Sequence, residues 1–488
     1  MTRRTREYFR ITKHTRRYNR KTNTFTINIA YQTATQKTPR TLQVAEAFGL
    51  GTDQQQKFTI YDNLKLKITP TDIIHITGDS GSGKSILLKT LKEDLKHLAA
   101  DTADLTIEQN KPIINTVGKT FPQALELLSK VGLNDAFLFT RKYNQLSDGQ
   151  KIRYQIAKLI ETDKQWWIID EFCSLLDRDT AKIVAYNTQK QARQKHKALI
   201  TATTHTDLQD DLKPTIHIHK RYGKEITIHR HPNTATHQCT LTRQMHVEEG
   251  NINDYKQLAP FHYRTSHLPP PRKIFTLKRK NELCGVIVYS HPPPTTHGRN
   301  KATKTTFQQI KNQLSTISRV IIHPKYRTIG LGAKIVQETL TKAPTPYVET
   351  LAVMAKYNPF FEKAGMQKIT ESKPTKNTTA TLEQLKQLGF NQAMIGSENY
   401  NQQKIEKTDK QKLIQTLKEL SKKESALRKR LLCLPDVYPK HEEFTAKIER
   451  LNDRELAKTI KRLAIIAQTK VYLFWPPQTN PNHNKTEQ

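Results

Sequence analysis

Short apolar runs and charged stretches alternate along the first half of the chain. Residues 58–68 and 73–77 have the composition of strands, and the Thr-Pro-Thr-Asp sequence at 69–72 between them is typical of a turn. A stretch with helical spacing of its leucines follows at 85–99. Because strand and helix patterns keep alternating to about residue 220, this region is predicted to form an α/β domain.

A second α/β pattern occupies residues 240–370. Residues 273–290 predict a pair of strands, a proline-rich break follows at 291–298, and the run 318–323 predicts another strand that leads into a helix. Farther on, the pattern changes to highly charged helices that each have one apolar face. We expect a helical hairpin there, with the apolar faces formed by Leu413, Leu417, Leu420, Leu427, Leu431, Ile448, Leu456, Ile460 and Leu463.

The charge balance bears on the partners of the protein. The 488 residues include 80 Lys and Arg against 45 Asp and Glu, a formal net charge of +35. A field of this sign attracts polyanions and releases their counterions, so nucleic acid is the first partner expected. A basic proteome or an anionic membrane surface are the alternatives. Residues 1–21 interleave basic side chains with Tyr8, Phe9 and Tyr18, which suits phosphate neutralisation with base stacking and equally suits a solubilising tail.

The cysteines and the apolar runs indicate a compartment. The four cysteines have no CxxC spacing, which fits a reducing environment and argues against a zinc site. No apolar run approaches the roughly 18 residues that span a bilayer, and the first residues lack the apolar stretch of a secretory signal. A cytoplasmic protein without a membrane span is therefore expected, unless a partner anchors it.

Two motifs indicate nucleotide chemistry. Residues 78–85, GDSGSGKS, match the pattern GxxxxGK[ST] between a predicted strand and a predicted helix. Lys84 supplies positive charge at the β- and γ-phosphates, and the Ser85 hydroxyl can bind Mg²⁺. The strand at 166–169 ends in Asp170, placed to hold Mg²⁺ through water, and Glu171, placed to polarise the attacking water. ATP contacts are predicted for Gly78, Ser80, Gly81, Ser82, Gly83, Lys84 and Ser85.

Between these motifs, the sequence LSDGQ at 146–150 resembles the LSGGQ signature of ABC ATPases, with Asp148 where the family usually has Gly. Residues 174–177 are similar to the D-loop of that family, and His205 is similar to the switch histidine that contacts the γ-phosphate. One cassette has only half of each composite site, so the resemblance implies an ATP-dependent homodimer. It also implies that the ATP of a second subunit is contacted by Ser147, Gly149 and Gln150.

Two further family positions are assigned with alternatives. The aromatic ring that stacks on adenine is assigned to Phe48, with Phe58 as the alternative. The Q-loop glutamine is assigned to Gln109, which joins Ser85 and Asp170 as a metal-site residue. The segment between the phosphate loop and the signature is short. Since that segment couples cassettes to membrane domains in transporters, the chain resembles the ABC proteins that remodel nucleic acids or ribosomes.

Residues 318–333, SRVIIHPKYRTIGLGA, resemble motif A of the GNAT acetyltransferases. In that family a strand leads into an RxxGxG/A loop, and a helix begins at the loop. The resemblance implies that backbone N–H groups and the helix dipole bind the pyrophosphate of acetyl-CoA, while the strand edge pairs with the pantetheine arm. The residues expected to bind acetyl-CoA are Val320, Ile321, Ile322, Arg327, Gly330, Leu331, Gly332 and Ala333.

Residues 358–366, NPFFEKAGM, resemble motif B of the same family. Phe361 stands where many members have the tyrosine that protonates the departing thiolate, and a phenyl ring cannot donate a proton. Glu349 is assigned as the base because family bases often lie on the strand after the motif A helix. Other groups considered for proton transfer are His262, Tyr263 and Tyr357.

Together the motifs resemble the ABC-type ATPases fused to a predicted acetyltransferase domain, with ATP, Mg²⁺ and acetyl-CoA as cofactors. The first hypothesis is acylation of a nucleobase in RNA (tRNA or rRNA), less so DNA, with ATP hydrolysis driving clamping or substrate opening because acetyl-CoA is already activated. The second is a non-catalytic nucleic-acid clamp whose degenerate GNAT domain only binds CoA. The third is the ATP-binding subunit of a transporter, and protein acceptors remain open.

The expected fold class is α/β. An ABC-type P-loop ATPase domain is followed by a GNAT-like α/β domain and a C-terminal helical hairpin. The expected parts are a basic N-terminal arm at 1–42, the ATPase domain at 43–228, a linker at 229–240, the GNAT-like domain at 241–372, a helical region at 373–475 and a disordered tail at 476–488.

Overall fold

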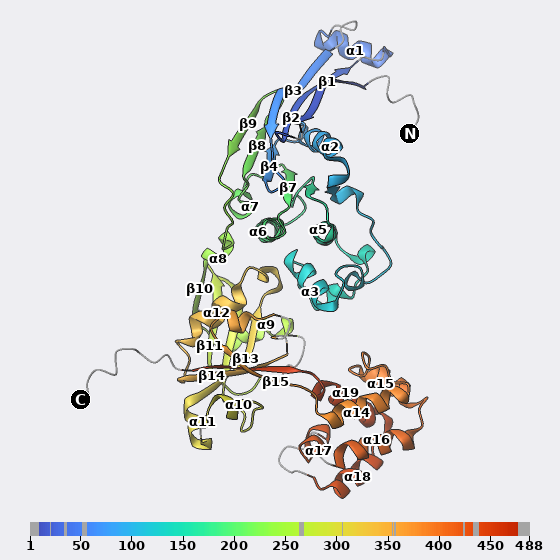
Figure 1. Cartoon of the computed structure of the whole chain (residues 1–488), viewed down its shortest axis with the longest axis vertical. Helices are drawn as coiled ribbons and strands as arrows, with labels where there is room; N and C mark the ends of the chain where they lie inside the picture. The colour runs from blue at the N-terminus through green and yellow to red at the C-terminus, as the bar shows by residue number, and fades with distance from the viewer. Residues whose placement is uncertain are drawn as a thin grey trace, which may run out of the picture. The chain divides into compact units, whose positions relative to one another are not determined.

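The computed structural model of the chain divides into two compact units (Figure 1). The first unit comprises Met1–Ser266, Phe275–Val286 and Ile321–Ile335, and the second comprises His267–Ile274, Ile287–Val320 and Val336–Gln488. The residues that the structure describes are 9–19, 21–33, 37–50, 56–262, 268–304, 306–353, 355, 358–422, 425–432 and 439–476.

A three-stranded antiparallel sheet opens the first unit, in the order β1-β2-β3. Residues 9–33 were expected to belong to a basic arm, and that expectation is wrong. Phe25, Ile27 and Ile29 alternate along β2 and are at most 2% exposed, so this hairpin contributes one apolar face to the core. The lysines and arginines of β1 conceal that pattern in the sequence. The elements are β1 (Phe9–Asn19), β2 (Thr24–Thr33), α1 (Pro39–Phe48) and β3 (Gln56–Lys67).

A six-stranded sheet with the order β5-β6-β7-β4-β8-β9 forms the centre of the first unit. All neighbouring strands are parallel except β9, which pairs antiparallel with β8. Every residue of β4 is buried, as a strand covered on both faces requires. The strands are β4 (Ile73–Gly78), β5 (Ala99–Asp101), β6 (Trp166–Ile169), β7 (Ala198–Thr203), β8 (Ile216–Lys220) and β9 (Ile226–Arg230).

Helices pack with this sheet in two apolar clusters. One cluster joins β4 and α2 to the β2 and β3 strands, and the other joins β6 and β7 to α3, α5 and α6. The predicted α/β domain is thereby confirmed. The helices are α2 (Lys84–Leu95), α3 (Phe121–Lys130), α4 (Ala136–Phe139), α5 (Asp148–Glu161), α6 (Arg178–Gln194), α7 (Gln209–Leu212), α8 (Thr240–Arg243) and α9 (Ile252–Leu258).

The linker expected at 229–240 is shorter in the structure, and its C-terminal end is bound to α7. Strand β9 continues to Arg230 and α8 begins at Thr240. The buried carboxylate of Asp211 accepts hydrogen bonds from the Thr240 backbone N at 2.7 Å and from its Oγ1 at 2.6 Å. These contacts fix where the chain leaves the six-stranded sheet.

A seven-stranded sheet has the order β10-β11-β12-β13-β14-β16-β15. Strands β11, β12 and β13 each contribute residues to both units. The strand pair predicted at 273–290 is confirmed as β11 and β12. The strands are β10 (Met245–Glu249), β11 (Pro271–Arg279), β12 (Glu282–Ser290), β13 (Leu314–Ile322), β14 (Tyr347–Ala352), β15 (Gln367–Ser372) and β16 (Lys470–Trp475).

The expected C-terminal hairpin is wrong. Helices α14 to α19 gather around a shared apolar cluster (Figure 1), and β16 then pairs antiparallel with β14 and β15. Polar residues such as Thr378, Thr381 and Asn401 fill part of the buried surface of α14 and α15, so these helices lack a clear apolar stripe. The bounds are α14 (Lys376–Gln387), α15 (Glu398–Ile405), α16 (Lys410–Lys422), α17 (Ser425–Leu432), α18 (His441–Glu449) and α19 (Asp453–Ile466).

The remaining helices are short. In the ranges that the structure describes, no helix has both the length and the apolar composition to cross a membrane. The tail expected to be disordered lies, from residue 477 on, outside the described residues. The remaining helices are α10 (Arg299–Ala302), α11 (Phe307–Gln313), α12 (Leu331–Leu340) and α13 (Phe360–Lys363).

A row of histidines crosses the central sheet of the first unit. His75 on β4 is opposite His217 on β8, which is opposite His229 on β9. His75 Nδ1 lies 2.9 Å from the Thr201 hydroxyl, and His217 Nε2 lies 2.8 Å from the Thr77 hydroxyl. Burial, with the charge of His217, lowers the pKa of His75 to about 3. Burial, with the neighbouring histidines, lowers the pKa of His217 to about 4. Both rings are therefore neutral in the folded protein at neutral pH.

In the second unit, an ion pair is buried where the proline-rich segment meets β14. Arg299 and Glu349 are 2% and 1% exposed, and the Arg299 guanidinium donates to Glu349 Oε1 at 2.6 Å and to Oε2 at 3.0 Å. The carbonyl oxygens of Pro293 and Pro294 accept further bonds from Arg299 at 2.9 and 3.0 Å, and the Thr296 hydroxyl accepts one at 2.8 Å. The Tyr472 hydroxyl also donates to Glu349 Oε2 at 2.9 Å. The proline-rich break thus supplies the acceptors for a buried cation.

Acidification should destabilise the protein through His75. Its pKa is lower in the folded than in the unfolded chain, so the unfolded chain binds more protons below about pH 6.5. Between pH 7.5 and pH 5 this residue should remove about 2 kcal/mol from the free energy of unfolding. Denaturant titration of the wild type and of His75→Gln at these pH values tests this. The variant should lose less stability on acidification. The control is His97→Gln, an exposed histidine outside this row, which should lose stability as the wild type does, and equal slopes for all three proteins would contradict the assignment.

Removing the cation of the buried pair should be strongly destabilising. Arg299→Met leaves the carboxylate of Glu349 buried without its counter-charge and should lower the free energy of unfolding by about 3–5 kcal/mol. The double variant Arg299→Met/Glu349→Gln should recover part of that loss, because no unpaired charge remains. Thermal unfolding followed by circular dichroism gives the comparison. Additive losses in the double variant would show that the two side chains do not act as a pair.

Candidate functional site

The phosphate-loop motif forms the connection between β4 and α2. Gly81 and Gly83 have positive φ angles of 76° and 102°. The Lys84 ammonium donates to the carbonyl oxygens of Gly78 at 2.8 Å and Asp79 at 2.7 Å. Burial lowers the pKa of Lys84, and the negative charges of Glu171, Asp170 and Asp79 partly oppose that shift. The lysine therefore lies inside the loop and within the field of the acids predicted to act beside it.

The glycines of this loop serve two different purposes. A Cβ on Gly83 would lie 2.6 Å from Ile60 Cγ2, and a Cβ on Gly78 would overlap the backbone of Lys220. Around Gly81 there is open space. Two glycines thus let the loop pack on its own domain, and the third leaves room for a ligand.

Tyr61 supports the loop from β3. Its hydroxyl donates to the Gly83 carbonyl at 3.0 Å, and the Lys220 ammonium lies 5.3 Å from its ring centroid. Burial raises the pKa of Tyr61, so the hydroxyl stays a donor. Sequence reasoning missed this residue, because one tyrosine in an alternating strand carries no signal of its own.

The loop fits a chain of phosphates. The buried Ser82 hydroxyl has no hydrogen-bond partner within the described residues. The first backbone N–H groups of a helix, here those of Lys84 and Ser85, have no helical carbonyl one turn earlier to bind, which makes a helix start a site for anions. With the open space at Gly81, these donors suit phosphate oxygens.

The two predicted acids follow β6 at the same edge of the sheet. Parallel strands present their carboxyl ends at one edge, so the residues after β6 and β4 face the same side. Glu171 is exposed and has a φ of 50°, and its backbone N donates to Asp170 Oδ1 at 2.9 Å. The Phe172 N donates to the Ala202 carbonyl at 2.7 Å and holds this turn on β7. A non-glycine residue in this conformation costs about 1–3 kcal/mol, as is common at functional turns.

The predicted switch histidine belongs to the same edge. His205 follows β7, the strand between β6 and β4, and is half-buried. Its backbone N donates to the Thr203 hydroxyl at 3.3 Å. The catalytic roles of Glu171 and His205 stay predictions.

The signature sequence begins helix α5. Ser147 is the exposed N-cap residue, and its backbone N donates to the Gln150 side chain at 3.1 Å. A Cβ on Gly149 would lie 3.0 Å from Leu176 Cδ2. The D-loop sequence thus packs directly on the signature loop, and the start of α5 is left exposed to a ligand outside the subunit.

The other predicted nucleotide contacts lie on the surface. Phe48 ends α1 and is 76% exposed, whereas Phe58 is 38% exposed and its ring centroid lies 5.1 Å from that of Tyr222. Gln109 is exposed in a turn between β5 and α3. The assignments of these three residues stay predictions.

The second phosphate-type turn joins β13 to α12. Thr328 and Gly330 have φ angles of 75° and 88°, and the space around Gly330 is open. The Arg327 guanidinium donates to the carbonyl oxygens of Ile322 at 2.9 Å and Asn134 at 2.7 Å. Val320, Ile321 and Ile322 end β13, and Leu331, Gly332 and Ala333 form the first turn of α12.

The residues named for acyl transfer belong to different elements of the chain. Glu349 accepts hydrogen bonds from Arg299, Thr316 and Tyr472, which occupy both carboxylate oxygens. Its assignment as a base stays a prediction. Phe361 is 5% exposed and its ring centroid lies 4.1 Å from that of Phe360. Tyr263 and Tyr357 lie outside the described residues, and His262 is half-buried.

Comparison with known proteins addresses the first site. The family model for the ABC transporter matches residues 61–174, which include the phosphate loop, the signature and both acids. The cytochrome c biogenesis ATP-binding export protein CcmA of Ruegeria pomeroyi is 30% identical over 168 residues, 30% of this chain and 79% of that protein. The chain belongs to the ABC transporter ATP-binding family. We use the name ABC cassette for this matching part together with the rest of the six-stranded sheet, its helices and the segment that follows β9 up to α8.

Other matches fall on the same part of the chain. CcmA of Reclinomonas americana is 28% identical over 180 residues, 30% of this chain and 79% of that protein. The ribosome protection protein VmlR of Bacillus subtilis is 29% identical over 133 residues, 26% of this chain and 23% of that protein. The dimeric structure of MJ0796, a bacterial ABC transporter cassette, covers 36% of this chain and 92% of its own at 18% identity, with a TM-score of 0.30.

The ABC cassette is an ATPase domain that binds ATP. Mg²⁺ neutralises phosphate charge in such sites, and the Ser85 hydroxyl and the Asp170 carboxylate are the groups that would hold it. Over the described ranges, no group of three or more His, Cys, Asp or Glu side chains is arranged to hold a metal. A magnesium bound mainly by phosphates and water needs no such group.

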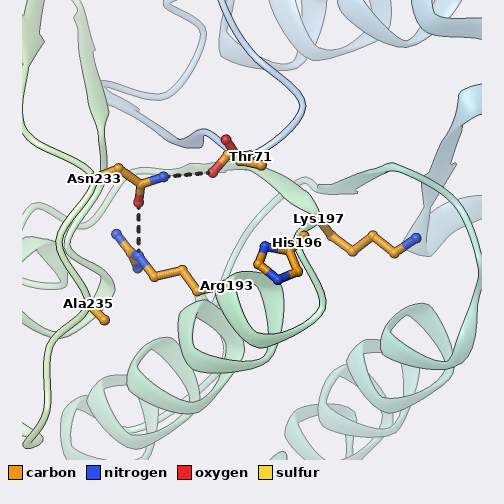
Figure 2. Close-up of a pocket in the computed structure, with 6 residues that line it drawn as sticks. All are labelled: Thr71, Arg193, His196, Lys197, Asn233 and Ala235. Atoms are coloured by element: carbon orange, nitrogen blue, oxygen red, sulfur yellow. Dashed lines mark hydrogen bonds between the residues drawn. The ribbon is translucent and has the colours of Figure 1, made fainter.

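A cavity of about 200 Å³ lies elsewhere in the ABC cassette (Figure 2). Thr71 precedes β4 and Lys197 precedes β7, so the cavity is at the amino ends of these strands, opposite the phosphate loop. Asn233 accepts from Arg193 Nε at 3.1 Å and donates to the Thr71 carbonyl at 3.3 Å. The Lys197 ammonium donates to the Asp163 carbonyl at 3.0 Å. Because its cations are bound to protein oxygens, this cavity is structural.

The two kinds of glycine in the phosphate loop predict different losses. Gly83→Ala should lower the free energy of unfolding by about 2 kcal/mol and ATP affinity at least about tenfold, because its φ of 102° and the nearby Ile60 exclude a side chain. Gly81→Ala should cost about 1 kcal/mol of stability, since only its φ is unfavourable. Thermal unfolding and ATP titration measure both. Equal effects on stability would contradict the packing role of Gly83.

Proposed function

We propose that this chain couples ATP hydrolysis to acetyl-CoA-dependent acylation of a nucleobase in RNA, either tRNA or rRNA. The observation that carries this proposal is a second strand–loop–helix turn, from β13 to α12, with open space at Gly330. Its first helical turn presents backbone N–H groups, as the phosphate loop does at α2. These donors suit the pyrophosphate of acetyl-CoA. The protein groups that would bind it are the backbone N–H groups of Gly330, Leu331, Gly332 and Ala333.

The nucleotide chemistry requires two copies of the chain. Lys84 binds the phosphates in one copy, and Ser147 and Gly149 of a second copy face the γ-phosphate. Glu171 polarises the attacking water and His205 contacts the γ-phosphate. Leu175 of the D-loop is 63% exposed, and a second copy would cover this apolar side chain. An ATP-dependent homodimer therefore belongs to the proposal.

The acyl-transfer step lacks the usual proton donor at Phe361. That ring is buried against Phe360, and a phenyl group has no proton to give to a departing thiolate. Either another group donates the proton or the thiolate leaves unassisted. Acetyl-CoA is an activated thioester, so ATP is not needed for the transfer itself, and its hydrolysis is assigned to clamping or opening the acceptor.

The choice of RNA rests on charge. A net charge of +35 favours a polyanionic partner, and a base must leave its stack before an enzyme can modify it. The name of one relative, the ribosome protection protein VmlR, also supports an RNA-containing partner. The names of the CcmA relatives, ATP-binding export proteins, support instead the ATP-binding subunit of a transporter. Phe361 favours a third candidate, a nucleic-acid clamp that binds CoA without transfer.

ATPase assays with RNA should separate these functions. Bulk tRNA or rRNA should stimulate ATP hydrolysis by about tenfold or more over duplex DNA or buffer. Glu171→Gln should reduce the stimulated rate by about 10²–10⁴ because it removes the base. Transfer of labelled acetyl groups to the stimulating RNA then distinguishes an acyltransferase from a clamp. Absence of stimulation by any nucleic acid would contradict the RNA proposal and favour a transporter subunit.

A further inference from the structure

The loop between β13 and α12 is bound along its length to the ABC cassette, within the first unit. At one end, Lys325 Nζ lies 2.8 Å from Asp179 Oδ2 and 3.6 Å from Asp177 Oδ1. At the other end, Asn187 Nδ2 donates to the Thr328 hydroxyl at 3.0 Å. We call residues 325–329 the docked loop. Asp177, Asp179 and Asn187 all belong to the N-cap or body of α6, the helix that follows the D-loop.

Asp179 is the main ionic contact of the docked loop. Its Oδ2 accepts from Lys325 at 2.8 Å and from the Arg279 guanidinium at 2.9 Å. The Tyr326 hydroxyl lies 3.2 Å from the same oxygen and has its shorter bond, at 2.7 Å, to Glu282 Oε2. Burial opposes ionisation, but the bonds to Lys325 and Arg279 outweigh it and lower the pKa of Asp179. The side chain of Asp179 is 17% exposed and that of Arg279 is 19% exposed, so solvent screens this cluster less than a surface pair. One carboxylate therefore holds two cations from different strands or loops.

A second connection begins at the signature helix. Arg153 on α5 donates to the carbonyl oxygens of Gly149 at 3.1 Å and Gly132 at 2.8 Å. Two residues beyond Gly132, the Asn134 carbonyl accepts from Arg327 of the docked loop at 2.7 Å. The signature loop and the docked loop thus hold the same short segment of backbone.

The D-loop links these contacts to the ATP site. Leu176 packs on Gly149 of the signature, and Asp177 caps α6 by accepting from the Thr180 backbone N at 3.2 Å. Ser174 donates to the carbonyl of Glu171, the predicted catalytic acid, at 2.9 Å. A short, continuous set of contacts therefore runs from the ATP site to Asp179 and the docked loop.

We propose that ATP binding raises the affinity for acyl-CoA of the turn at Gly330, which directly follows the docked loop, with Asp179 as the positioning residue that couples the two sites. Closure of two cassettes on ATP orders the D-loop and the start of α6, and the attached loop loses motion with them. A ligand that needs the ordered loop then binds with a smaller entropic penalty. Thr328 has a left-handed backbone conformation, and its hydroxyl accepts a hydrogen bond from Asn187 on α6. Ordering of α6 would stabilise this strained conformation.

This inference rests on the proposed acetyl-CoA site, and a binding experiment separates the two. The experiment uses the full chain with Glu171→Gln, so that added ATP is bound but should not be hydrolysed during the titration. Calorimetric titration with acetyl-CoA, with and without ATP and Mg²⁺, should give an affinity at least about fivefold higher with ATP. Because coupling is reciprocal, saturating acetyl-CoA should raise ATP affinity by the same factor.

Substitutions then test Asp179 itself. Asp179→Asn, in the same background, should bind acetyl-CoA without ATP and should bind ATP alone, but the ratio of affinities should fall toward one. Lys325→Met should act in the same way, since it removes the cation by which the docked loop binds Asp179. Asp210→Asn is the matched control, because that acid is 79% exposed and pairs with Lys213 at the end of α7. It should keep the full ratio, and thermal unfolding shows that each variant is folded.

Each result has a definite meaning. Failure of acetyl-CoA to bind with or without ATP overturns both the acetyl-CoA site and the coupling. Equal affinity with and without ATP overturns the coupling and leaves the proposed site standing. An unchanged ratio in folded Asp179→Asn and Lys325→Met overturns the role given to Asp179.

Discussion

Burial of β4 on both faces is the constraint on which the ABC cassette depends. The strand lies between β7 and β8, and a strand covered on both faces has a strongly specified register. Its last residue, Gly78, meets the backbone of Lys220 where no side chain fits. The start of the phosphate loop is therefore fixed by the core, and Lys84 and the first turn of α2 follow from it.

The two phosphate-type turns of the chain differ in what holds them. The turn at α2 is held by its own domain through Tyr61, Ile60 and the Lys84 ammonium. The turn at α12 is held by charged and polar contacts to α6 and to the loop after α3. The contacts of the first turn come from its own loop and the adjacent strand β3, whereas those of the second turn come from α6 and the loop after α3.

Two acids at the start of α6 show how neighbouring carboxylates acquire different tasks. Asp177 and Asp179 lie two residues apart, yet the first caps α6 and the second binds Arg279 and Lys325. In the second unit, Glu349 is paired with Arg299 and is surrounded by donors. These donors occupy both oxygens of the carboxylate, which a carboxylate can accept because each oxygen has two lone pairs.

The sequence by itself determined the ABC cassette, because phosphate binding needs particular residues at fixed spacing along one local turn. The phosphate loop at 78–85, the signature at 146–150 and the acids at 170 and 171 are local features of this kind. The sequence also predicted the strands β11, β12 and β13 from their apolar runs. It missed the β1–β2 hairpin, where basic residues mask the alternation. It predicted a helical region at 373–475 but not that six helices share one core, because the buried surface of α14 and α15 includes threonine and asparagine.

Only the tertiary structure decided which distant residues meet. Tyr61 beneath the phosphate loop, the pairing of Asp179 with Lys325 and Arg279, and the insertion of β16 between β14 and β15 join segments far apart in the chain. A lysine or an aspartate on a helix has the same local pattern whether it is solvated or paired. Its partner is chosen by how the chain packs, and that depends on all the segments together.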